Sequence, residues 1–142
     1  MIDRDGLVLS DDLAMIDVGL VHHWLSERSY WASGRSLDTV RRSIANSHCI
    51  GVYENGSQVG FTRVVSDEAT FAWVCDVFVH EERRGAGIGR WMVGEAVEWC
   101  NEVGILRITL GTRDAHGVYE GVGFVPLAKP ERWMEIDHRA KF

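Results

Sequence analysis

Three glycines at alternate positions are the residues best suited to binding an anion. Gly85, Gly87 and Gly89 follow a long apolar segment and open an amphipathic one. Where a strand turns tightly into a helix at such a point, successive backbone N–H groups converge and no Cβ atom obstructs them. Arg83 and Arg84 add positive charge beside the turn. The pattern predicts a site for phosphate groups, and for a diphosphate in particular.

The residues after these glycines argue against two common nucleotide-binding motifs. A dinucleotide-binding fold needs a third glycine in the pattern GxGxxG, and Arg90 occupies that position. A P-loop needs a Lys-Ser or Lys-Thr pair after its last glycine, whereas Gly89 is followed by Arg90 and Trp91. Coenzyme A remains as the diphosphate ligand that the segment would bind.

The glycine segment resembles the signature of the GNAT superfamily of N-acetyltransferases. That signature has Arg or Gln, two residues, Gly, one residue, and then Gly or Ala, and Arg84, Gly87 and Gly89 match it. The resemblance extends over most of the chain. It implies that acetyl-coenzyme A is the cofactor.

A second element of the family resembles the segment from Tyr119 to Phe124. The sequence departs from the family's usual residues at three positions near these two elements. Glu81 stands where Pro is frequent, Arg113 where Asn is frequent, and His116 where Ala is frequent.

The resemblance also implies which residues hold the cofactor. The backbone of residues 77–79 would hydrogen-bond the pantetheine arm and the acetyl carbonyl group, and the amides of residues 84–90 would hold the pyrophosphate. The expected cofactor-binding residues are Val77, Phe78, Val79, Arg84, Gly85, Ala86, Gly87, Ile88, Gly89 and Arg90.

Acetyl transfer to an amine requires two proton movements. The attacking amine must be neutral, although a lysine-type amine has a pKa of about 10.4 and is almost fully protonated at pH 7. The leaving thiolate needs a proton, which a positioned phenol can supply. The resemblance places the Tyr119 hydroxyl near the sulfur, and we predict Tyr119 as the acid. The alternative is that Tyr119 only packs against the sheet.

Asp76 is the predicted general base. A carboxylate inside an apolar run is rarely buried without a partner or a purpose. Asp76 could equally form a structural ion pair with Arg63 or Arg113. Asp114 and His116 are rival bases, and Asp114 could instead cap a helix.

The acceptor pocket is expected, by analogy with the family, between the first two helices and the sheet. This location points to Tyr30, Trp31 and Arg35 as substrate-binding residues, although the two aromatic side chains could equally belong to the core. The aromatic rings would suit a cationic amine, and Arg35 or Arg63 would suit an acceptor that carries a carboxylate. The sequence leaves this choice open.

Composition indicates a globular protein. The chain has 142 residues, 46% hydrophobic and 25% charged, which predicts a single domain over residues 1–142. The net charge of −6 argues against a nucleic-acid partner and favours a cationic acceptor such as an amine. The sequence has no membrane-spanning stretch or signal peptide, so we expect a cytoplasmic protein. A homodimer is plausible from the family.

Cysteine and histidine spacing predicts no metal site. Cys49, Cys75 and Cys100 are odd in number, widely spaced and set in apolar runs, so we expect free, buried thiols. The histidines do not have the spacing of metal ligands.

Hydrophobic periodicity predicts two helices near the N-terminus, ahead of the sheet. The first spans about residues 17–27 with Asp17 as its cap, and Ser36 caps the second. Residues 29–35 form an aromatic loop between them.

The next segment is predicted to form strands. The pair Asn55 and Gly56 predicts a type I′ hairpin between strands at 49–53 and 58–65. Residues 70–79 are apolar on both faces, which predicts a central, buried strand.

Beyond the glycine segment we expect a helix that ends at Gly104 and a strand at residues 105–110. A short helix at 114–121 and strand pieces near Phe124 and at 132–136 follow. The predicted fold class is α/β, a GNAT-like mixed and mostly antiparallel sheet of six to seven strands with about four helices.

These observations together predict an N-acetyltransferase. It would transfer an acetyl group from acetyl-coenzyme A to a primary amine of a small molecule or peptide, by direct attack of the amine. The alternative is a non-catalytic acyl-coenzyme A-binding or regulatory module that keeps the glycine turn but has no turnover.

Overall fold

A meander of strands forms the centre of the fold. The computed structural model describes residues 1–139, and in it each strand pairs with the next along the chain to give the order β1-β2-β3-β4-β5-β6. All pairs are antiparallel except β5 with β6, whose parallel pairing requires a crossover that contains α3. The strands are β1 (Ile2–Arg4), β2 (Leu7–Ser10), β3 (His48–Glu54), β4 (Ser57–Ser66), β5 (Ala72–Val79) and β6 (Ile108–Leu110). The mixed, mostly antiparallel sheet confirms the predicted fold class.

The β3–β4 hairpin has the predicted turn. Asn55 and Gly56 have φ angles of 50° and 83°, and a type I′ turn requires positive φ at both central residues. The turn sets the register that pairs Glu54 with Ser57.

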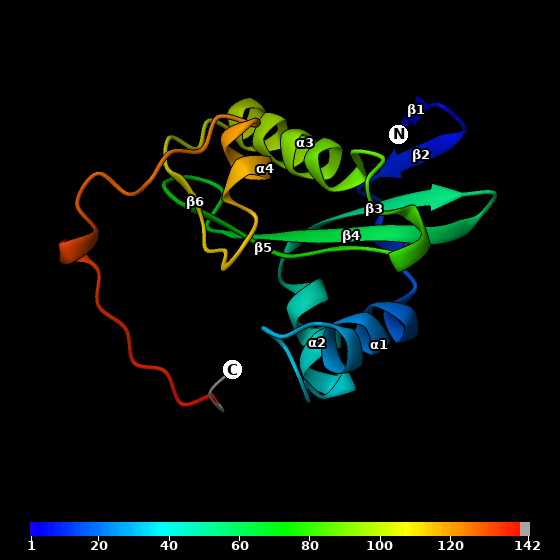
Figure 1. The fold of residues 1–142 in the computed structure, drawn as a ribbon, viewed down its shortest axis with the longest axis horizontal. Coiled ribbons are helices and arrows are strands. Elements are labelled where there is room, and N and C mark those ends of the chain that lie inside the picture. The colour runs from blue at the N-terminus through cyan, green and yellow to red at the C-terminus, as the bar shows by residue number, and fades with distance from the viewer. Residues whose placement is uncertain (140–142) are drawn as a thin grey trace.

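Helices cover both faces of the sheet. Figure 1 shows α1 and α2 on one face and α3 and α4 on the other. The helices are α1 (Val18–Arg28), α2 (Leu37–Ala45), α3 (Ile88–Val103) and α4 (His116–Glu120). One hydrophobic core lies between α3 and the sheet, and a second lies between the α1–α2 pair and the sheet. Within residues 1–139 no helix is both long and apolar enough to cross a membrane.

Three predicted helix ends are confirmed. The Asp17 side chain accepts a hydrogen bond of 3.1 Å from the Leu20 N–H and caps α1, and Ser36 accepts one of the same length from the Thr39 N–H to cap α2. Gly104 ends α3 with a φ of 94°, a conformation that glycine adopts at little cost.

The two ends of the chain differ from the prediction. Strands β1 and β2 precede the helices, because the apolar segment around Val8 pairs with β3. The strand pieces expected near Phe124 and at residues 132–136 were wrong: between α4 and residue 139 the chain forms no strand, and its one helical segment is a short 3-10 helix at Pro130–Arg132. Val125 and Met134 are 81% and 97% exposed, whereas Val122 and Phe124 pack against the core without pairing with a strand. An apolar pattern forms a strand only where another strand pairs with it.

The β6 strand and the last helix are shorter than predicted. β6 covers three residues, where 105–110 was expected, and α4 covers five, where 114–121 was expected. The N-cap residue of α4 is Ala115, and no side chain caps this helix. Asp114 therefore does not have the capping role that the sequence offered as an alternative.

Candidate active site

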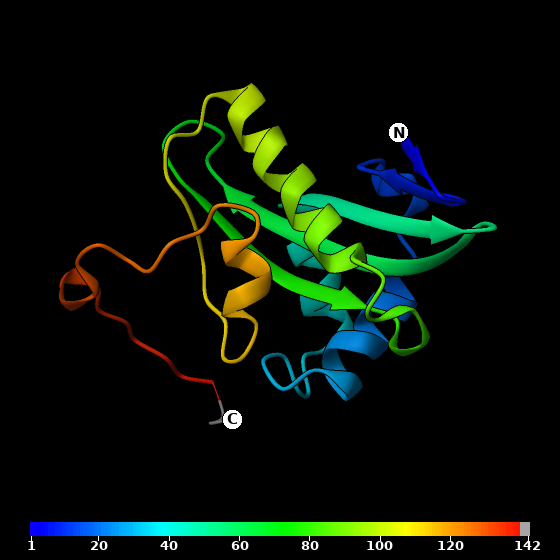
Figure 2. The same cartoon turned by 45° about the horizontal axis from the view of Figure 1, so that its top comes forward.

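Strand β5 has a free edge over its second half. β6 pairs with Ala72, Trp73 and Val74, and within residues 1–139 no strand pairs with residues 75–79 on that side. Figure 2 shows α3 lying across the sheet and α4 beside β5. The Val79 carbonyl oxygen on this edge accepts a hydrogen bond from Arg84 Nε. The other backbone groups on this edge have no strand partner there, and a ligand that lies along the strand can bind them.

A β-bulge at Asp76 lies close to the point where the β6 pairing ends. Asp76 has a φ of 52°, and the register with β4 shifts between Phe61 and Arg63. Aspartate is among the residues that adopt this left-handed conformation most readily. The extra residue of the bulge reverses the alternation of side chains along β5. As a result, Val74 packs in the core under α3, whereas Phe78 packs in the core under α1 and α2.

The Asp76 carboxylate is buried among three hydrogen-bond donors. Its side chain is 2% exposed. Oδ1 accepts a bond of 3.0 Å from Trp31 Nε1, and Oδ2 accepts bonds of 2.8 Å from Arg35 Nη1 and 2.6 Å from Arg63 Nε. Arg63 Nη1 also donates to Ser47 Oγ. Asp76 therefore forms the ion pair with Arg63 that the sequence offered as one of its two possible roles. The bonds from Trp31 and Arg35 connect the aromatic loop to the sheet.

Arg113, the other partner considered for Asp76, has a different position. Its guanidinium group lies over the Tyr30 ring, 3.7 Å from the ring centroid, and the Arg113 N–H donates to the Tyr30 hydroxyl. Tyr30 and Trp31 also pack edge to face with ring centroids 5.1 Å apart.

One open cavity of about 1040 Å³ brings most of the predicted site residues together. Its lining includes Tyr30, Trp31, Arg35, Asp76, Val77, Phe78, Val79, Arg84, Gly89 and Tyr119. Five predicted cofactor-binding residues are not part of this lining, namely Gly85, Ala86, Gly87, Ile88 and Arg90. The Ile88 side chain is in the core, and Arg90 Nη2 donates to the Gly121 carbonyl oxygen.

The glycine turn has the shape of an anion cradle at the start of α3. Gly85 and Gly87 have φ angles of 86° and 81°, and nothing lies within 4 Å of where a Cβ atom would be at either residue. Gly87 caps the 16-residue helix α3 with no side-chain hydrogen bond, which leaves N–H groups of the first turn without a side-chain partner. Arg84 lies beside the turn and its Nε donates to the Val79 carbonyl oxygen at 3.0 Å. The turn therefore fits a pyrophosphate group.

Of the two arginines before the turn, Arg84 alone lines the cavity. Arg83 donates from Nε to both carboxylate oxygens of Glu54, at 3.1 and 3.3 Å, and so ties the turn to the end of β3.

Tyr119 lies on α4 at the cavity wall. Burial raises the pKa of Tyr119 above its ordinary value, and the nearby Tyr30 and Asp114 raise it further. The phenol therefore keeps its proton at neutral pH and can act as a hydrogen-bond donor. Asp114 also lines the cavity, whereas His116 does not.

Cys75 is the one cysteine in the cavity lining of residues 1–139. Burial raises the pKa of the Cys75 thiol to about 12. Because the thiolate is the nucleophilic form, this side chain is poorly suited to forming an acetyl intermediate at neutral pH.

Arginine dominates the charge of the cavity. Within the described residues the lining has six arginines and two aspartates, in a chain whose net charge is −6. Sequence reasoning missed Arg28 and Arg139 in this set, because these residues lie far apart in the chain and share no motif. No local signal would have identified them.

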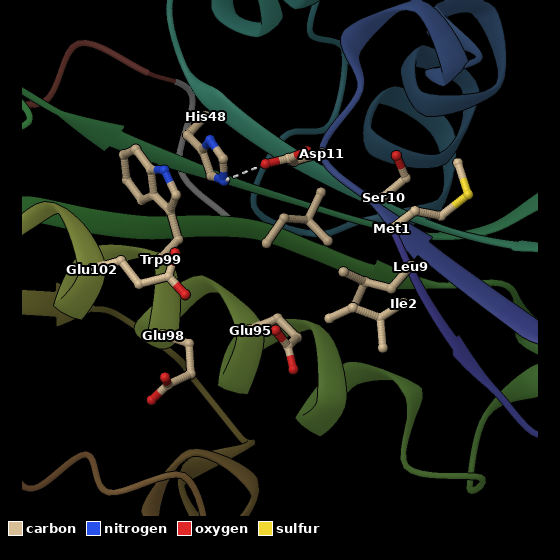
Figure 3. Close-up of a pocket in the computed structure, with 11 residues that line it drawn as sticks. Met1, Ile2, Leu9, Ser10, Asp11, His48, Glu95, Glu98, Trp99 and Glu102 are labelled. Carbon is tan, nitrogen blue, oxygen red and sulfur yellow. Dashed lines mark ion pairs between the residues drawn. The ribbon is translucent and has the colours of Figure 1, made fainter.

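A second, smaller cavity of about 170 Å³ lies between α3 and the strands β1–β3 (Figure 3). His48 stacks on Trp99 with ring centroids 3.8 Å apart, and its Nε2 lies 3.9 Å from Asp11 Oδ2. Three further carboxylates from α3 line this cavity, those of Glu95, Glu98 and Glu102.

Similarity to known proteins identifies the family to which this α/β fold belongs. The pattern of the acetyltransferase (GNAT) family matches residues 19–124. The crystal structure of a Xanthomonas campestris protein assigned to the GNAT family is 38% identical, with a TM-score of 0.89 over 95% of both chains. This chain belongs to the acetyltransferase (GNAT) family.

Two other similarities are less extensive. A Gibberella zeae protein named as an acetyltransferase is 28% identical over 109 residues, a match that spans 63% of this chain and 62% of the relative. N-acetylglutamate synthase from Neisseria gonorrhoeae, solved in complex with coenzyme A and N-acetyl-glutamate, is 14% identical with a TM-score of 0.68. That match covers 91% of this chain and 30% of the synthase, and it concerns the fold.

Proposed function

We propose that the protein transfers an acetyl group from acetyl-coenzyme A to a primary amine of a small molecule or peptide. The family supports acetyl transfer in general. The observation that carries the finer proposal is the free edge of β5, which shares one cavity with Arg84 and Gly89 of the glycine turn.

Backbone and side-chain groups between the free edge of β5 and the glycine turn would hold the cofactor. The backbone of residues 77–79 would hydrogen-bond the pantetheine arm, and the N–H groups at the start of α3 would bind the pyrophosphate with Arg84 beside it. The bound cofactor supplies an activated acetyl thioester. The arginines of the cavity lining favour a ligand that carries phosphates, with Arg28 and Arg139 also paired to Glu81 and Asp137 outside the lining.

Tyr119 would donate a proton to the departing sulfur. Its raised pKa keeps the phenol protonated before the reaction, as an acid requires. The amine attacks the acetyl carbon directly, so that a C–N bond forms and the C–S bond breaks. The high pKa of the Cys75 thiol supports this route over an acetyl-cysteine intermediate, and we expect Cys75→Ser to keep the rate within about twofold.

Two carboxylates in the cavity could accept the proton that the amine loses. Asp76 already accepts three hydrogen bonds, so we propose that it mainly orients Arg35 and Arg63. Asp114 is exposed, and its Oδ2 lies 3.7 Å from Arg113 Nη2. We propose Asp114 as the acceptor. In this case Asp114→Asn lowers kcat/KM about 100-fold, and an unchanged kcat/KM would return the role to Asp76.

Isothermal titration calorimetry with acetyl-coenzyme A tests the proposal. We expect binding with a Kd in the micromolar range by the wild type and its loss in Gly87→Trp. Gly56→Trp is the matched control, because Gly56 has a similar φ of 83° and equally open surroundings at the tip of the β3–β4 hairpin. If acetyl-coenzyme A binds, a panel of primary amines is then tested for acetylation by the protein. No binding by the wild type would contradict the proposal, and binding without acetylation of any amine would favour the non-catalytic module.

A further inference from the structure

The part of the cavity around Asp76 carries more positive charge than the Asp76 carboxylate balances. Arg35 and Arg63 share the Asp76 carboxylate, and their side chains are only 19% and 14% exposed. Two guanidinium groups against one carboxylate leave one positive charge uncompensated within the cluster. Because water solvates these side chains poorly, an anion that enters the cavity would gain a favourable interaction there.

Arg35 has hydrogen-bond donors to spare. Among residues 1–139 its side-chain hydrogen bonds use Nη1 alone, which donates to Asp76. A guanidinium group presents five N–H donors in a planar fork, and Arg35 lines the cavity. The remaining edge of that fork matches the geometry of a carboxylate or phosphate.

The aromatic loop gives little room to a cationic group. The Arg113 guanidinium already covers the Tyr30 ring, and the Trp31 indole N–H donates to Asp76. A cationic group bound here would meet Arg35 and Arg113, and like charges repel. The structure therefore favours the carboxylate reading of this loop, which the sequence left open against a cation cage.

We propose that the acceptor amine carries a second, anionic group, a carboxylate or a phosphate ester, and that Arg35 binds this group. This inference rests on the proposed function, since it names the class of acceptor for the same cavity. The hydrogen bond to Asp76 fixes the direction of the Arg35 guanidinium group. The site would therefore select an anionic group by its position as well as by its charge.

A binding experiment that needs no turnover tests the site. N-acetyl amino acids are titrated beside their primary amides in the presence of coenzyme A, and O-phosphoethanolamine is titrated beside ethanolamine. We expect the anionic member of at least one pair to bind about tenfold more tightly, as a charge-assisted bidentate contact predicts. The arm that shows the preference identifies carboxylate or phosphate. Equal binding within every pair, or no binding of any anionic member, overturns the proposal.

Substitutions separate a binding role for Arg35 from a structural one. Arg35→Gln should remove the preference for the anionic member and raise the Kd of that member while leaving the Kd of the uncharged member unchanged, and Arg35→Lys should keep part of the preference. Arg42→Gln is the control, because Arg42 lies on α2 with a 74% exposed side chain outside the cavity. Equal losses for both members of a pair would overturn the assignment. If Arg35→Gln does not fold, the wild-type pairs still decide.

The acetyltransferase proposal can fail separately. If the protein acetylates no amine but binds anionic ligands through Arg35, the catalytic proposal is wrong and the anion site stands. If amines without an anionic group are acetylated as efficiently as those with one, the catalytic proposal stands and the anion site is wrong.

Discussion

The two cavities of the molecule lie at opposite edges of the sheet and have opposite charge. The large one beside β5 is lined by six arginines and two aspartates, and the small one beside β1–β3 by Asp11, three glutamates and His48. Their charged groups are held in different ways. Asp76, Arg35 and Arg63 are largely buried and bonded to one another, whereas Glu98 and Glu102 are exposed to solvent.

This difference shows what distinguishes a binding site from a charged surface. In the large cavity, arginine side chains converge beside a strand edge and a helix start whose backbone groups are free to bind a ligand. In the small cavity, water solvates Glu98 and Glu102 and leaves them little to gain from a ligand. The sign of the charge by itself does not show which cavity binds a ligand.

The largest expected effect comes from removing the buried carboxylate. Asp76→Asn leaves two poorly solvated arginines without their counterion, and loss of one partner of a buried ion pair costs about 3 kcal/mol. Asparagine also tolerates the positive φ, so the backbone is not the cause. Urea denaturation measures the loss, and Glu98→Gln is the control that should keep the wild-type midpoint. Equal stability of the two variants would remove the distinction between the cavities.

Catalysis should depend on the large cavity alone. Tyr119→Phe removes the proposed proton donor, and we expect kcat to fall about 100-fold with little change in the Kd for acetyl-coenzyme A. Steady-state kinetics and calorimetry together measure this. Glu98→Gln should keep the wild-type kcat. If Tyr119→Phe also keeps it, Tyr119 has the packing role that was its alternative.

A smaller effect is expected at the glycine turn. Arg84→Gln removes a cation beside the proposed pyrophosphate site, and we expect acetyl-coenzyme A to bind about tenfold more weakly and with less dependence on salt. Titrations at low and high salt measure both quantities. Unchanged affinity would show that the backbone of the turn is sufficient without Arg84.

The smallest effect concerns pH and the small cavity. Burial lowers the pKa of His48 below its ordinary value, against the opposing effects of Asp11 and Glu68. The unfolded chain therefore binds the proton more readily, so His48 contributes stability that is present above pH 6.5 and is lost as the pH falls below it. His48→Phe should lose less stability than the wild type between pH 7 and pH 5, as urea titrations at each pH would show. A parallel pH dependence in both proteins would contradict this.

Local elements of the fold were predictable because their causes are local. Asp17 and Ser36 cap helices through bonds to residues three positions on, and Asn55 with Gly56 sets a two-residue turn. The strands expected after α4 do not form, because no strand pairs with the segment around Met134, whose side chain stays exposed.

The sequence by itself determined the glycine turn, its flanking arginines and the family, because those features reside in consecutive residues. Tertiary structure decided the rest of the site. The bulge at Asp76 arises from pairing with β4, and the meeting of Asp76 with Arg35 and Arg63 joins three segments that no spacing rule connects. Buried charge selects its partners by proximity in space, and that proximity exists only after the chain has folded.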